Sequence, residues 1–152
     1  MTAAVEIRPG SADDLTVLVA VLGERHWFTD RLARQRRGGG VVLVAWLEGR
    51  PVGEVFLDLE PATEPEVRRQ LAGVPRLDHL EVAGPLWGRG IGTALIGAAE
   101  AAARQLGYER IALGVGLDSR RARRLYARLG YADWGQGTVV GTWWSIPMLG
   151  HR

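Results

Sequence analysis

A strand, a glycine-rich turn, a helix and a second strand follow one another between residues 77 and 116. The apolar positions of 77–82 indicate the first strand, and the alanine-rich stretch 90–106 is typical of a helix that ends near Gly107. At 111–115 every second residue is a branched apolar one, which indicates another strand. Two strands joined by a helix run parallel in one sheet, and the crossover between them is right-handed. This order restricts the chain to the α/β class.

The remaining segments add strands and helices on both sides of this unit. With 152 residues, the chain has the size of one domain with one core, so we expect a single domain over residues 1–152. The order of elements is β-α-α-β-β-β-α-β-α-β-β, which predicts a mixed sheet. Outside the central unit we expect a strand at 3–8, a helix from Ser11 to Leu22, a helix at 24–37, strands at 41–47 and 55–59, a loop with a helical turn at 60–75, a helix at 122–129 and two strands within 131–149.

The composition excludes several reaction chemistries. All nineteen basic residues are arginine, and the absence of lysine excludes a Walker-type phosphate loop, a Schiff base and a lysine general base. The chain has no cysteine, which excludes disulfides, thiolate zinc sites and a cysteine nucleophile. Neither the GxSxG motif of serine hydrolases nor the HExxH motif of zinc enzymes is present. We therefore expect no metal.

Two further features bear on location. The longest apolar runs, such as 41–47, are far shorter than the ~20 residues that a membrane span needs. Residues 1–10 include the charged Glu6 and Arg8 and lack the apolar region of a signal peptide. We therefore expect a cytoplasmic protein without a membrane partner.

The turn over residues 82–93 is suited to binding a phosphate group. Glycines remove side chains from the turn, and the helix that follows presents unpaired N–H groups and the positive end of its dipole. Arg89 can add a charge-assisted contact. A dinucleotide fingerprint does not fit, because Thr93 stands where the third glycine counted from Gly88 should be. A tight turn without a ligand remains the alternative.

Two motifs at a fixed separation resemble those of the GCN5-related N-acetyltransferase (GNAT) superfamily. The first reads Trp87-x-x-Gly90-x-Gly92, where the family has Gln or Arg at the first position. The second begins with serine where the family has asparagine. It reads Ser119-x-x-Ala122-x-x-Leu125-Tyr126-x-x-x-Gly130-Tyr131. The resemblance is close over 80–130, about a third of the chain, and the order of elements fits over nearly all of it.

The resemblance implies a fold and an activity. The fold is a single-domain GNAT-like α/β fold, with a mixed central sheet of about six or seven strands, about four flanking helices and two splayed parallel strands that bind the donor. The implied activity is transfer of an acetyl group from acetyl-CoA to a primary amine of a small molecule or peptide. The backbone of Leu80 and Val82 is expected to pair with the pantetheine arm, and the turn from Trp87 to Thr93 to hold the pyrophosphate. The implied donor-binding residues are Leu80, Val82, Trp87, Gly88, Arg89, Gly90, Ile91, Gly92, Thr93 and Ser119.

The resemblance also suggests how protons and charge are handled. Tyr126 occupies the family's general-acid position, where it would protonate the departing thiolate, although a tyrosine that only packs in the core is the alternative. The N–H group near Val82 is the implied oxyanion donor. Asp78 is our candidate base, because its even spacing predicts the same strand face as Leu80 and Val82. His79 is expected on the other face, and removal of the proton through a water chain stays open.

The arginines are concentrated in the half of the chain that contains both motifs. Residues 1–76 carry ten arginines and eleven acids, a net charge of −1, whereas 77–152 carry nine and six, a net charge of +3. Five of these arginines lie within 120–128 and can coat a solvated helix, meet the 3′-phosphate of coenzyme A, or bind tRNA. An acyltransferase that uses aminoacyl-tRNA, or a degenerate CoA-binding module, therefore remains an alternative to the acetyltransferase.

The sequence says less about where the amine acceptor binds. The resemblance places it at residues 24–28 and in the final strands. His26-Trp27-Phe28 and Trp143-Trp144 can line a cleft for an amine or fill the core and the surface of a homodimer. Glu24 or Glu54 can hold a cationic acceptor, and the sequence does not choose between them.

Overall fold

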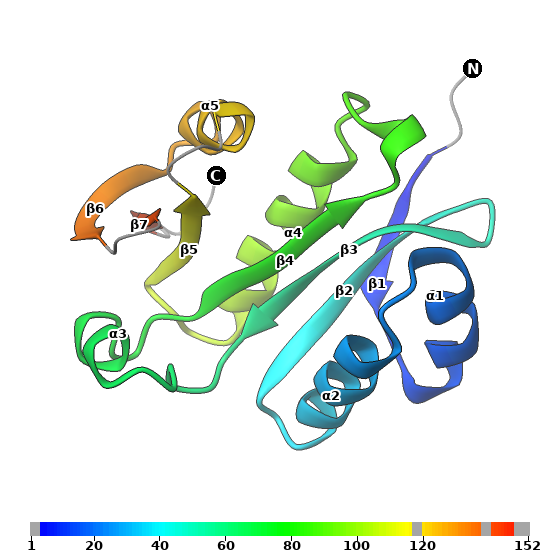
Figure 1. Cartoon of the computed structure of the whole chain (residues 1–152), viewed down its shortest axis with the longest axis horizontal. Coiled ribbons are helices and arrows are strands. Elements are labelled where there is room, and N and C mark those ends of the chain that lie inside the picture. Colours follow the sequence, from blue (N-terminus) through cyan, green and yellow to red (C-terminus); the bar gives the residue numbers. More distant parts are fainter. Residues whose placement is uncertain (1–3, 117–119, 138–140, 148–152) are drawn as a thin grey trace.

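The computed structural model describes residues 4–116, 120–137 and 141–147, which form one mixed sheet with helices on both faces (Figure 1). Within these residues the sheet has seven strands in the order β1-β2-β3-β4-β5-β7-β6. Neighbouring strands are antiparallel except β4 and β5, which are parallel. The predicted α/β class is confirmed. The strands are β1 (Glu6–Pro9), β2 (Gly40–Leu47), β3 (Arg50–Asp58), β4 (Arg76–Val82), β5 (Arg110–Gly116), β6 (Ala132–Gly137) and β7 (Gly141–Pro147), and the helices are α1 (Leu15–Leu22), α2 (Arg25–Arg36), α3 (Pro65–Gln70), α4 (Ile91–Gln105) and α5 (Arg120–Arg128).

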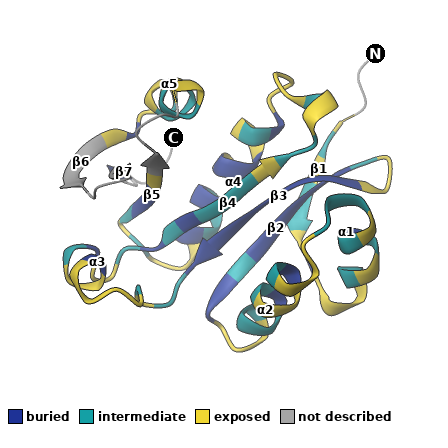
Figure 2. Cartoon of the chain, viewed as in Figure 1, coloured by how far each residue is buried: buried dark blue, intermediate teal, exposed yellow. Residues whose placement is uncertain are grey.

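Helices α1 and α2 cover one face of the sheet. Strand β2 is almost continuously apolar because its two faces are both covered, and the even-numbered residues face these helices. In Figure 2 the strands at the centre of the sheet are buried, whereas the outer surfaces of α1 and α2 are exposed. The buried residues of this first core are Leu18, Phe28, Leu32, Val42, Val44, Trp46 and Phe56.

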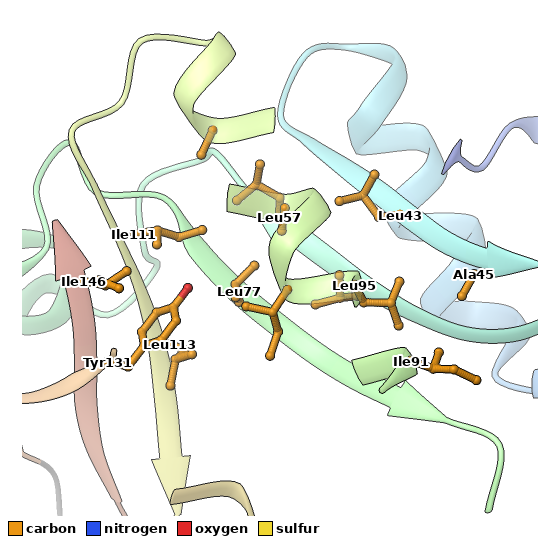
Figure 3. Close-up of a cluster of buried hydrophobic side chains, with 14 of the residues drawn as sticks. Leu43, Ala45, Leu57, Leu77, Ile91, Leu95, Ile111, Leu113, Tyr131 and Ile146 are labelled. Carbon is orange, nitrogen blue, oxygen red and sulfur yellow. The ribbon is translucent and has the colours of Figure 1, made fainter. Parts of the chain in front are cut away.

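Helix α4 covers the opposite face and builds the larger core. Its alanines let the helix lie close to the sheet, while Ile91 and Leu95 project into the apolar cluster. Figure 3 shows these two side chains within the cluster that also contains Leu43, Leu57 and Leu77, which come from three different strands. The crossover from β4 through α4 to β5 is therefore anchored along most of its length.

Strands β4 and β5 separate soon after they begin to pair. Their ladder joins Arg76 to Ala112 and Leu77 to Leu113, and the described residues contain no further pair between these strands. Strand β4 nevertheless continues to Val82. The predicted pair of splayed parallel strands is confirmed, and it opens a gap along the end of β4.

The helices are short. The longest of them, α4, has 15 residues, fewer than the ~20 that span a bilayer. No helix within the described ranges has both the length and the apolar character that a membrane crossing requires.

Candidate active site

The backbone at the end of β4 faces the gap. On the β3 side, the N–H group of Ala83 donates a hydrogen bond of 2.8 Å to the carbonyl of Val52. Successive residues of a strand direct their backbone groups to opposite edges, so the N–H and carbonyl of Val82 point away from β3. The Val82 carbonyl accepts a hydrogen bond of 2.6 Å from the indole N–H of Trp87. The N–H group of Val82 is thus directed into the gap, beside the glycine turn.

Two glycines with positive φ shape the turn between β4 and α4. Gly88 and Gly90 both have a φ of +81°, a region that costs other residues about 1–2 kcal/mol. A Cβ atom would meet nothing within 4 Å at either position. Glycine is therefore needed for its positive φ and not to leave room for a neighbouring atom. Gly90 caps α4, and the unpaired N–H groups of the first helical turn therefore open at the gap.

A cavity of about 920 Å³ lies between the end of β4, the start of α4 and α5. This volume is within the range of small-molecule sites, roughly 300–1,000 Å³. Arg89 does not contribute to its lining, and Ser119 lies outside the described residues. The predicted donor-binding residues that line the cavity are Leu80, Val82, Trp87, Gly88, Gly90, Ile91, Gly92 and Thr93.

Helix α5 gives the cavity a positively charged wall. The arginines that line it are Arg120, Arg121, Arg124 and Arg128. The guanidinium of Arg121 lies over the indole ring of Trp87, with its central carbon 4.8 Å from the ring centroid. This contact joins α5 to the glycine turn across the mouth of the cavity. Trp87 is 56% exposed, so the pair stands at the solvent boundary of the site.

Tyr126 extends from α5 into the same cavity. Its ring also makes an edge contact with Tyr131, at a centroid distance of 6.1 Å and an interplanar angle of 62°. Burial raises the pKa of the Tyr126 phenol above its ordinary value of 10.0. The hydroxyl therefore keeps its proton through the neutral range, which is the state that a general acid requires.

Strand β4 contains a bulge, which interrupts the ideal alternation assumed in the sequence analysis. Phe56 pairs with Asp78, and Glu54 pairs with Glu81, so one residue of β3 stands opposite two of β4. His79 occupies the bulge with a φ of +59°. The extra residue shifts the alternation of side chains along the rest of the strand.

The bulge corrects the placement of Asp78. Leu80 and Val82 pack toward the α4 core, whereas Asp78 lies opposite Phe56 on the face covered by α2. There its carboxylate accepts a hydrogen bond of 3.1 Å from Arg31, and it does not line the cavity. The prediction that Asp78 shares a face with Leu80 and Val82 is therefore wrong, and with it the geometric reason for choosing this residue as the base.

A second polar cluster lies on the α2 face at the same bulge. The Nδ1 atom of His79 is 2.6 Å from Oε1 of Glu54, and its Nε2 atom is 2.9 Å from Oε2 of Glu24. The imidazole ring stacks on Trp27 at a centroid distance of 4.3 Å. Because Glu54 and His79 are 25 residues apart, no motif joins them. The one sequence signal is an acidic residue inside the otherwise uncharged stretch 51–57 of strand β3.

Glu54 is the most buried member of this cluster, with 1% of its side chain exposed. Burial raises the pKa of its carboxyl from 4.5 to about 10. Arg31 opposes this rise only in part. The negative charges that add to it are those of Glu81, Glu24 and Asp78, in that order.

The aromatic residues of the predicted acceptor side have separate roles. Phe28 is fully buried in the α2 core, as the packing alternative predicts. Trp27 contacts Phe28 with one edge and presents its face to His79, so it belongs to both the core and the polar cluster. The side chains of Trp143 and Trp144 lie outside the described part of the structure.

The sequence profile of the acetyltransferase (GNAT) family matches residues 11–131. The chain belongs to this family. Over 107 residues, 70% of its length, it is 32% identical to an uncharacterised N-acetyltransferase of Methanocaldococcus jannaschii. The chain spans 45% of the length of that relative.

Solved structures with the same fold include one in complex with coenzyme A and one with acetyl-CoA. The PaiA N-acetyltransferase of Thermoplasma acidophilum, in complex with coenzyme A, has a TM-score of 0.78 at 15% identity, covering 95% of this chain and 99% of that one. A Salmonella typhimurium protein solved with its cofactor acetyl-CoA has a TM-score of 0.72 at 17% identity, with coverages of 99% and 97%. The ribosomal-protein-alanine N-acetyltransferase of Brucella melitensis has a TM-score of 0.76 at 20% identity, with coverages of 93% and 99%. Because these identities are low, the solved structures support only the fold of this GNAT chain.

Proposed function

We propose that the protein is an N-acyltransferase that moves an acetyl group from acetyl-CoA to a primary amine of a small molecule or peptide. The observation that carries this proposal is the cavity where β4 leaves β5, with the start of α4 at one side and the arginines of α5 at another. Family membership supports it, and so does the presence of coenzyme A or acetyl-CoA in two similar structures. When bound, the coenzyme supplies a thioester that an amine can attack.

The cavity has a suitable group for each part of the donor. The first turn of α4, with its unpaired N–H groups, suits the pyrophosphate, and the arginines of α5 suit the 3′-phosphate. The open edge of β4 at Leu80 and Val82 suits the amide groups of the pantetheine arm. Ser119, the remaining predicted contact, stays a proposal without a described position.

Two groups at the inner end of the cavity suit the chemistry. The N–H group of Val82 points into the gap, where it can donate to the oxyanion that forms as the amine attacks. Tyr126 holds its proton and can transfer it to the departing sulfur. The reaction then needs only a route for the proton that leaves the nitrogen.

The test is a thiol-release assay, to which this chain is well suited because it contains no cysteine that would react with the detection reagent. Acetyl-CoA is mixed with n-propylamine, an amino-acid amide, a diamine or a short peptide with a free amino terminus. With at least one amine, we expect the protein to accelerate thiol release by about tenfold or more over the rate without protein. The mass of that amine should rise by one acetyl group. No amine-dependent release from acetyl-CoA across this panel would contradict the proposal.

An extension of this assay addresses tRNA as acyl donor or acceptor. The arginines of α5 and the exposed Trp87 are compatible with an RNA partner as well as with coenzyme A. Aminoacyl-tRNA is therefore added once as the acceptor with acetyl-CoA, where thiol release reports transfer, and once as the only acyl donor, where the gain in mass of the amine and the formation of deacylated tRNA report it. Transfer that requires the tRNA, together with no binding of coenzyme A, would replace the proposed donor.

A further inference from the structure

The bulge of β4 places His79 between two carboxyl groups. His79 and Glu24 both have positive φ, +59° and +58°, a conformation that is uncommon outside glycine, although asparagine, aspartate and histidine adopt it more often than other residues do. Residues in this conformation persist where surrounding contacts hold them, and they are frequent at functional sites. Here the contacts are the two carboxyls on the ring nitrogens and the indole of Trp27 against the ring face.

The three groups form a line from the interior to solvent. The exposed fraction of the side chain rises from 1% for Glu54 to 21% for His79 and 51% for Glu24. A neutral imidazole donates a hydrogen bond from one ring nitrogen and accepts one at the other. His79 can therefore accept from a protonated Glu54 at Nδ1 while it donates from Nε2 to the carboxylate of Glu24.

Glu54, at the buried end of this line, has a carboxyl oxygen that accepts no hydrogen bond. Oε1 of Glu54 contacts His79, whereas the buried Oε2 atom has no hydrogen-bond partner. A buried polar atom without a partner is costly, so it indicates a group that is completed by something the chain does not contain. The described residues include no set of three or more His, Asp or Glu side chains placed to hold a metal ion.

The charges around Glu54 favour a cationic guest. Asp78 and Glu81 of β4 and Glu24 at the start of α2 are the acids that act on it, and Arg31 of α2 is the opposing cation. The guanidinium of Arg31 already donates to Asp78 and Asp30. A protonated amine that approaches from the α2 face therefore meets an excess of negative charge.

The line begins next to the wall of the cavity. Glu54 stands directly opposite Glu81 in the β3–β4 ladder, and Glu81 lines the cavity that we assign to acetyl-CoA. Directly paired residues of neighbouring strands have Cα atoms about 4.5–5.5 Å apart. The cluster on the α2 face and the cavity on the side of α4 and α5 thus meet at the bulge.

We propose, on the basis of the proposed acetyl transfer, that Glu54, His79 and Glu24 form a proton relay that carries the proton of the attacking amine to solvent. Glu54 is the base that receives it at Oε2, and His79 and Glu24 pass it on. The proton on Oε1 of Glu54 moves to Nδ1 of His79, the proton on Nε2 moves to Glu24, and Glu24 releases it to water. One proton enters and one leaves. To restore the starting state, the 21%-exposed imidazole gives its Nδ1 proton to water and takes one at Nε2 from water through Glu24, and rotation of the Glu54 carboxyl returns its proton to the oxygen that faces Nδ1.

The kinetic test compares two small nucleophiles in the variants Glu54→Gln and His79→Asn. Glutamine has the shape of a protonated glutamate, and asparagine tolerates the positive φ of His79. With n-propylamine near neutral pH, we expect kcat to fall by about 100-fold in both variants, with little change in the KM for acetyl-CoA. The loss should shrink as the pH approaches the pKa of the free amine, because solvent then supplies the neutral nucleophile.

Hydroxylamine provides the discriminating comparison. Its nitrogen is largely uncharged at neutral pH and loses its proton to water readily, so kcat should fall by less than about threefold. The control Glu48→Gln makes the same change in the exposed β2–β3 turn, and it should leave both rates unchanged. Equal losses with both nucleophiles would indicate a structural role, and no loss with n-propylamine would indicate another base. Either result would overturn the relay.

A spectroscopic readout separates the relay from the proposed function. In wild-type protein with ¹⁵N-labelled histidine, His79 should be neutral, with its proton on Nε2, and the signal is assigned by its loss in His79→Asn. Glu54→Gln should change the ring-nitrogen shifts whether or not an acceptor has been found. A ring protonated on both nitrogens at neutral pH would overturn the relay even if thiol release succeeds. The expected tautomer without any transferase activity would instead contradict the proposed function alone.

Discussion

Replacing Tyr126 with phenylalanine is expected to lower kcat by about 10²- to 10⁴-fold at saturating acetyl-CoA and amine. In the proposed reaction the phenol donates the proton to the departing sulfur. It lines the cavity, and its raised pKa keeps the proton available. Phenylalanine retains the ring and its edge contact with Tyr131, so the KM for acetyl-CoA and the thermal stability should change little. Initial rates of thiol release measure the loss.

A matched control uses another tyrosine of the chain. Tyr108 follows α4, packs beside the α4 core and does not line the cavity. The Tyr108→Phe variant removes the same hydroxyl and should keep nearly the full rate. If Tyr126→Phe lowers kcat by less than about twofold, the phenol is not the acid, since a general acid contributes far more than that.

Replacing Glu54 with glutamine is expected to stabilise the protein increasingly as pH rises. The Glu54 carboxyl of the unfolded chain ionises near its ordinary pKa of 4.5, whereas burial raises that pKa to about 10 in the folded protein. Between these values the unfolded chain holds fewer protons, so the wild type loses at most about 1.4 kcal/mol of stability per pH unit. Near pH 7 the variant should be more stable on the order of 3 kcal/mol, and below pH 4.5 the difference should vanish.

Denaturant unfolding of both proteins at several pH values measures this difference. Comparing the two proteins at each pH removes the contributions of all other titrating groups, because these are common to both. A stability difference that stays constant from acid to alkaline pH would show that Glu54 is ionised in the folded state. That outcome would also remove the protonated starting state of the relay.

The central unit of the fold could be predicted because its signals are local. Gly88 and Gly90 lie in a turn that needs positive φ, and an alanine-rich helix follows directly. Together with the strands on either side, these features predict that β4 and β5 run parallel, as the structure has them. The separation of this pair was inferred through the family resemblance rather than from the residues themselves.

The polar cluster could not be predicted because it depends on the register of two strands. An ideal strand alternates, and that assumption placed Asp78 on the wrong face. The bulge at His79 arises from the pairing of β3 with β4, and neither glycine nor asparagine marks it in the sequence. Glu54 was considered only as one of two acids for a cationic acceptor, since its burial and its contact with His79 are tertiary features.

Calorimetric titration with acetyl-CoA tests most directly whether the cavity binds the donor. We expect one equivalent to bind with a dissociation constant in the micromolar range. The Arg121→Gln/Arg124→Gln variant removes two guanidinium groups from the cavity wall and should weaken binding by about tenfold or more. The Arg68→Gln/Arg69→Gln variant changes the same number of charges on α3, outside the cavity, and should bind as the wild type does. No binding to the folded wild type, or equal affinities of the two variants, would contradict the assignment of this cavity to coenzyme A.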